Sequence, residues 1–140
     1  MTETTNVSLG PVHDLLAGKG YAVSEAGENA LTIQDVETGV SIQGVLEGEI
    51  LFFSLLCMTS PAQRLTEQVM RKMLGAENGI STSYFQLYDA PNGEIAVTLN
   101  NFCKLQGLGA DDEDDILSCV SFLLADVVHA KQLIGEDLAG

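Results

Sequence analysis

The spacing of apolar residues along the chain changes period several times, and each change predicts a new element. Leu9, Val12 and Leu16 follow a helical spacing, so a short helix is predicted after a candidate N-cap at Ser8. Gly18 follows the last of these apolar residues and is expected to end the helix.

Three strands are predicted next. Residues 30–34 and 40–46 alternate apolar with polar side chains, which predicts two half-buried antiparallel strands. Residues 50–58 are apolar on both faces, so this strand is expected to be central and covered on both sides. Residues 21–23 could form a short strand as well, but the predicted sheet is built without it.

Two further helices are expected. Ser60 followed by Pro61 is typical of a helix start, and Gly75 is expected to end that helix. The last helix is predicted to run from the acidic residues 111–115 to a stop at Gly135.

The alternating pattern returns over residues 80–88 and 95–102, and the Asn-Gly pair at 92–93 is a strong hairpin signal. The whole pattern predicts an α+β fold with a mainly antiparallel five-stranded sheet and three helices, in the order α-β-β-β-α-β-β-α. We expect a single domain over residues 8–140, preceded by a disordered N-terminal end at residues 1–7.

The last helix carries a heptad-like apolar seam with further apolar residues beside it, so we expect it to be buried on two sides. Two other short helices in a 140-residue chain leave little material to cover both sides. Either the helix is sandwiched inside one chain or it also contacts a second copy of the chain, and the second arrangement is favoured. The predicted interface residues on it are Val120, Leu123, Val127 and Ile134.

The chain is strongly acidic. It has 20 Asp and Glu against 6 Lys and Arg, which gives a formal net charge of −14. Such a chain repels nucleic-acid backbones and anionic lipid, so neither is an expected partner. The N-terminus lacks the apolar stretch of a secretory signal, and the run at 50–58 is shorter than the roughly 20 residues of a membrane helix. We expect a cytoplasmic protein.

Candidate chemistry is sparse, and no cofactor is expected. Cys57, Cys103 and Cys119 show no CxxC spacing and are predicted to be reduced, mostly buried thiols. One alternative is a small enzyme that uses Cys103 with a histidine, because Lys104 lies beside that thiol. A second alternative is a divalent-metal sensor at residues 111–115. The favoured interpretation of that run is a helix start, where Asp111 or Asp112 caps the helix and the other acids favour its positive end.

The order of elements resembles the YbjN-like family and the class I type III secretion chaperones that share its fold. The likeness covers roughly residues 8–134 and is carried by the helix from Ser60-Pro61 to Leu74-Gly75, the hairpin around Asn92-Gly93, and the loop at 107–115 that opens a long helix. The resemblance implies a non-enzymatic dimer that binds other proteins.

We therefore expect a homodimeric protein-binding module, chaperone-like or regulatory, that binds a polypeptide segment of a partner. Tyr84 and Tyr88 on the fourth predicted strand are the candidate anchors, because exposed aromatic side chains often dominate protein interfaces.

Overall fold

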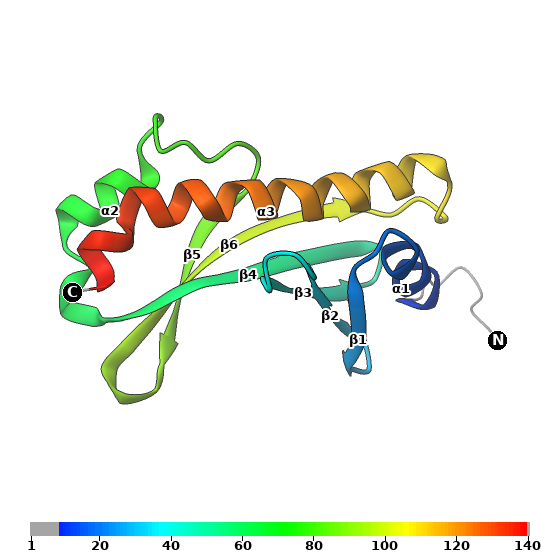
Figure 1. Ribbon diagram of the computed structural model, residues 1–140, viewed down its shortest axis with the longest axis horizontal. Coiled ribbons are helices and arrows are strands. Elements are labelled where there is room, and N and C mark those ends of the chain that lie inside the picture. Colours follow the sequence, from blue (N-terminus) through cyan, green and yellow to red (C-terminus); the bar gives the residue numbers. More distant parts are fainter. Residues whose placement is uncertain (1–8, 140) are drawn as a thin grey trace. The chain divides into compact units, whose positions relative to one another are not determined.

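The computed structural model describes residues 9–139, so the predicted cap at Ser8 and the predicted disordered end at residues 1–7 lie outside the described part. Its elements are α1 (Leu9–Gly18), β1 (Ala22–Gly27), β2 (Ala30–Gln34), β3 (Ser41–Glu47), β4 (Ile50–Pro61), the 3-10 turn η1 (Ala62–Arg64), α2 (Glu67–Leu74), β5 (Tyr84–Ala90), the 3-10 turn η2 (Pro91–Gly93), β6 (Glu94–Lys104) and α3 (Ala110–Ala139) (Figure 1). The α+β class and the three α-helices are confirmed.

The sheet has six strands, not the five predicted, and they are hydrogen-bonded in the order β1-β2-β3-β4-β6-β5. The additional strand is β1, which pairs antiparallel with β2. Its side chains are exposed except for the half-buried Val23, so it carries no buried alternation that a sequence pattern could reveal. In this order β1 and β5 are the two edge strands.

The chain divides into two compact units, of residues 1–54 with 101–121 and of residues 55–100 with 122–140. In the described part of the first unit, β1, β2 and β3 form an antiparallel meander next to α1 (Figure 1). Val12 and Leu16 on α1 are buried, as are Leu31 and Ile33 on β2. These apolar positions belong to the core of this unit. That residues 8–140 form a single domain stays a prediction.

The second unit contains the β5–β6 hairpin, α2 and the C-terminal half of α3. Asn92 and Gly93 have φ of 65° and 76°, which confirms the tight turn that their pair predicts. The core cluster of this unit consists of Val69, Met73, Val97, Ile134 and Leu138.

Two predicted boundaries on either side of α2 are wrong. Ser60 does not cap the helix: it lies within β4, and its buried hydroxyl donates to the main-chain oxygen of Leu138 at 3.2 Å. The cap is Thr66, whose hydroxyl accepts from the Val69 amide at 3.2 Å. The strand predicted from Ile80 begins only at Tyr84.

The predicted stop of the last helix at Gly135 is also wrong, because α3 continues to Ala139. Ile134 and Leu138 lie on either side of this glycine and are both buried. Their packing outweighs the cost of about 1 kcal/mol that a glycine imposes on a helix interior.

Candidate functional site

The edge strand β5 exposes more apolar surface than its position would be expected to tolerate. Tyr84, Leu87 and Tyr88 are 41%, 42% and 50% exposed. An edge strand presents main-chain N–H and C=O groups that a further strand can bind, and many proteins protect such edges with lysine or proline. β5, of sequence YFQLYDA, has neither, and its one charged residue is Asp89.

The neighbouring strand β6 holds β5 in place through polar side chains. Thr98 lies opposite Gln86 and donates from Oγ1 to its main-chain oxygen at 3.1 Å. Asn100 lies opposite Tyr84, and its Nδ2 is 3.5 Å from the Tyr84 oxygen and 2.8 Å from Thr98 Oγ1. Both side chains are buried, so these hydrogen bonds hold β5 as an ordered edge strand.

The predicted anchors Tyr84 and Tyr88 lie on the same face of β5, since they are four residues apart on a strand. Gln86 lies between them, and the Tyr88 hydroxyl donates to its Oε1 at 2.6 Å. Leu87 points to the opposite face and was not among the predicted residues. Side chains alternate along β5 as they do in any half-buried strand, so the sequence alone does not reveal that Leu87 is exposed.

A second apolar surface of this unit lies on α2. Met70 and Leu74 are 37% and 76% exposed and line a shallow groove together with Glu67, Arg71 and Gly75. The basic residues of this helix are paired: Arg71 Nε lies 2.7 Å from Glu67, and Lys72 Nζ lies 2.8 Å from Asp137. The surface is therefore apolar with locally neutralised charge.

The predicted interface residues of α3 lie inside the chain. Val120, Leu123 and Ile134 are fully buried and Val127 is 4% exposed, so these side chains pack in the core without a second copy. The outward apolar residues of the helix are Phe122 and Val128. By length and composition α3 is apolar enough to cross a membrane, but a buried core helix has the same composition.

One polar residue of α3 is buried for a structural reason. Asp126 is 1% exposed and accepts hydrogen bonds from the Ser81 amide and hydroxyl and from the Ser83 hydroxyl, the last at 2.5 Å. Burial raises the pKa of Asp126, but the hydrogen bonds from Ser83 and Ser81 outweigh burial and hold the pKa below its ordinary value. Asp126 therefore fastens the loop before β5 to α3.

The acidic run at 111–115 also has a structural role. Asp112 is buried, and its Oδ2 accepts from the amides of Gln106 and Leu108 at 2.6 and 2.7 Å. The Asp112 carboxylate thus binds the loop before α3. The predicted cap would instead bind the first amides of the helix. Among residues 9–139, no group of three or more His, Cys, Asp or Glu side chains is arranged to hold a metal ion.

The side chain that shifts the pKa of Cys103 most is Cys119, not the histidine that the enzyme alternative requires. Cys103 on β6 and Cys119 on α3 both belong to the first unit, and the interaction between their side chains raises the pKa of Cys103 and lowers that of Cys119. The sequence gives no sign of this pair, because the two cysteines lie on different elements.

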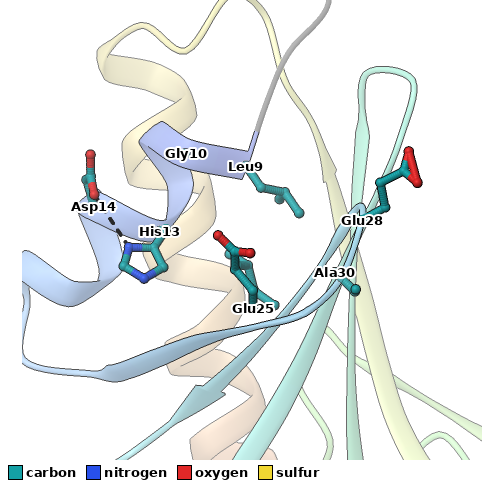
Figure 2. A pocket seen from close by; sticks show the side chains of 9 residues that line it. Leu9, Gly10, His13, Asp14, Glu25, Glu28 and Ala30 are labelled. Carbon is teal, nitrogen blue, oxygen red and sulfur yellow. Dashed lines mark ion pairs between the residues drawn. The ribbon is translucent and has the colours of Figure 1, made fainter.

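A pocket of about 540 Å³ lies between α1 and the β1–β2 turn, and Figure 2 shows its lining. His13 Nδ1 lies 3.4 Å from Asp14 Oδ1, and Glu25 and Glu28 also line the pocket. Its described lining contains no Ser or Cys, so a histidine and a carboxylate lie together there without a nucleophile. The acidic side chains make the pocket suited to a cationic group.

No protein family and no curated protein matches the chain by sequence. Two solved structures are similar in fold. YbjN from E. coli, described as a candidate transcription regulator, superposes with a TM-score of 0.69 over 98% of both chains at 10% identity. A chain of the ExsC–ExsE complex superposes with a TM-score of 0.56 over 91% of this chain and 97% of that chain at 17% identity. The protein therefore has a YbjN-like fold, as the order of its elements predicts.

Proposed function

We propose that this protein is a non-enzymatic module that binds an extended polypeptide segment of a partner along the free edge of β5. The observation that carries the proposal is the exposure of Tyr84, Leu87 and Tyr88 on an edge strand without lysine or proline. The likeness to a chain of the ExsC–ExsE complex supports it, because that chain is part of a complex between proteins.

The binding mode follows from the properties of an edge strand. A partner segment adds a seventh strand beside β5, and its main chain forms hydrogen bonds with the free edge. Tyr84 and Tyr88 contact side chains on one face of that segment and Leu87 contacts the other face. Aromatic side chains supply large contact area at low entropic cost, so the two tyrosines are expected to contribute most of the affinity.

The charge of the chain defines the class of partner. A formal charge of −14 disfavours DNA, RNA and anionic membranes, whereas it attracts cationic or amphipathic segments. We infer that any regulatory role is exerted through protein contacts. We further propose that the protein is cytoplasmic and that it forms a homodimer. The exposed apolar residues of α2 and α3 offer surface for a second copy.

The experiment is co-purification from native cells with a tagged protein. Tyr84→Ala combined with Tyr88→Ala, and separately Leu87→Lys, are expected to lose a partner that the wild type retains. Val36→Lys is the matched control, because Val36 is apolar and 68% exposed but lies in the turn between β2 and β3. Retention of the same partner by both β5 variants, each shown by circular dichroism to be folded, would contradict the proposal.

A further inference from the structure

The first unit carries an apolar surface on its own part of the sheet. It consists of Val45 on β3, Phe52 on β4 and Phe102 on β6, and these three strands are neighbours in the order of the sheet. Val45 is 36% exposed, Phe102 is 55% exposed, and Phe52 is half-buried. The rings of Phe52 and Phe102 form a tilted pair with centroids 5.9 Å apart. We call these three residues the sheet patch.

The three side chains of the sheet patch point to one face of the sheet. Gly44 and Phe53 are buried, and a Cβ on Gly44 would lie 3.6 Å from the Phe53 ring, so these two residues share the core face. Side chains alternate along a strand, so Val45 and Phe52 point to the opposite face. Phe102 lies on that face too, because its ring pairs with Phe52. The patch is therefore one continuous apolar surface.

The negative charge of the chain is concentrated in this unit. Its described residues, 9–54 and 101–121, hold 12 Asp and Glu against 2 Lys, a formal charge of −10. Residues 55–139 hold 7 Asp and Glu against 4 Lys and Arg, a formal charge of −3. A second copy at the sheet patch would bring two units of −10 together. The charge therefore favours a cationic partner there over a second copy.

The strands that carry the sheet patch determine the shape of the partner. β3, β4 and β6 each have a neighbouring strand on both sides, so their main-chain groups are already paired. An extended segment laid over the patch would bury its own N–H and C=O groups without partners, which is costly. A helix pairs its own main-chain groups and can present one apolar stripe. An amphipathic helix therefore fits this surface.

We propose that the sheet patch is a second protein-binding surface, which takes a cationic amphipathic helix of a partner protein. The apolar stripe of that helix covers Val45, Phe52 and Phe102. The proposal goes beyond the function assigned to β5 and is independent of it, because the residues belong to the other unit and the partner segment is helical.

Charged residues at the rim of the patch orient the helix. Glu47 lies two residues after Val45 and Lys104 two residues after Phe102, and both are exposed on the face of the patch. β3 and β6 lie on opposite sides of β4, so the acid and the base border opposite sides of the patch. The cationic side chains of the helix are therefore expected beside Glu47 and away from Lys104.

The test uses a fluorescein-labelled synthetic helix with leucine on one face and lysine on the other, and fluorescence anisotropy measures its affinity for the protein. Phe102→Thr combined with Val45→Thr is expected to weaken binding about tenfold, because the apolar anchors are lost. Threonine is well tolerated in strands, so the fold should persist.

Val36→Thr is the matched control, since Val36 is 68% exposed and belongs to the same unit but lies outside the patch. It is expected to bind the helix as the wild type does. Tyr84→Ala combined with Tyr88→Ala is also expected to bind as the wild type does, which separates the patch from β5.

Two further variants test the orientation of the helix. Glu47→Gln is expected to weaken binding and Lys104→Gln to strengthen it, each by about twofold, because rim charges in solvent have small effects. A synthetic helix with glutamate in place of every lysine is expected not to bind.

Three outcomes would overturn the proposal. These are equal affinity of the lysine helix for the wild type and the folded patch variant, equal affinity of the wild type for the glutamate helix, and self-association of the wild type that Phe102→Thr abolishes in sedimentation. The last outcome would assign the patch to a second copy.

Amide chemical shifts of the wild type give a result that needs no variant. The lysine helix is expected to shift the amides around Val45, Phe52 and Phe102. Shifts confined to β5 would show that the helix binds the edge strand and would overturn the proposal for the patch.

Discussion

Asp126 shows at the scale of one residue why a polar position in an apolar helix is informative. In the sequence it is one of a few polar exceptions between Ile116 and Ala130, together with two serines and a histidine. Its burial depends on Ser81 and Ser83, which lie more than 40 positions earlier in the chain. A periodicity argument identifies the exception but not its partners.

Asp126→Asn is expected to lower the free energy of unfolding by about 2 kcal/mol, because the hydrogen bonds from Ser81 and Ser83 lose their charged acceptor. Urea unfolding followed by circular dichroism measures the change. Asp114→Asn is the control, since Asp114 is an exposed aspartate of the same helix. A similar loss in both variants would show that the Asp126 contacts carry no special weight.

The same site predicts a pH dependence. The pKa of Asp126 is lower in the folded chain than its ordinary value of 3.8. Its stabilisation is therefore complete above pH 3.8 and is lost as the pH falls below 3.8 through the folded pKa. The difference in unfolding free energy between wild type and Asp126→Asn should shrink over that window. A difference that stays constant, or grows on acidification, would contradict the lowered pKa.

Two adjacent residues of α3 distinguish a core seam from an interface. Leu123 is fully buried and Phe122 is 41% exposed. Leu123→Asp is expected to unfold the protein, because it places an unpaired carboxylate in the core, whereas Phe122→Asp should change stability by about 0.5 kcal/mol or less. Thermal melting measures both. A folded Leu123→Asp protein would restore the seam as a candidate contact surface.

At the scale of elements, the strongest periodic segments were predictable and the boundaries were not. The central strand and the Asn-Gly hairpin follow from local signals, and both are present as β4 and the β5–β6 hairpin. The position of the α2 cap was not predictable, because Ser60-Pro61 and Thr66 are both acceptable starts. Tertiary structure decides between them, because the Ser60 hydroxyl donates its hydrogen bond to the main-chain oxygen of Leu138.

Thr66→Ala is therefore expected to destabilise the protein by about 1 kcal/mol through loss of the α2 cap. Thr66→Asp should retain most of the stability, because aspartate is a good N-cap. Chemical unfolding of both variants provides the measurement. Equal losses for alanine and aspartate would place the helix start elsewhere.

At the scale of the molecule, the sequence predicted the fold better than the surface. The order of elements follows from periodicity, whereas exposure depends on which neighbours cover each face. Tyr84 and Tyr88 were predicted as anchors and are exposed, but Val120 and Leu123 were predicted at an interface and are buried. An apolar helix gives the same pattern in both situations.

The proposed homodimer is a property of the whole molecule and is tested by light scattering. The expected mass is twice the 14.9 kDa of one chain. Exposed apolar residues on α2 and α3 supply the physical reason, since such surface is usually covered by a partner. A mass of one chain at high micromolar concentration would contradict the proposed homodimer and would not affect the proposal for β5.

The central claim is that the β5 edge binds a partner, and site-specific photocrosslinking in the native cell tests it most directly. A photoreactive amino acid at position 87 is compared with the same amino acid at position 36, which is more exposed but lies outside β5. A discrete crosslinked protein is expected at position 87 and none at position 36. Crosslinks of equal yield at both positions, or a partner captured only at position 36, would contradict it.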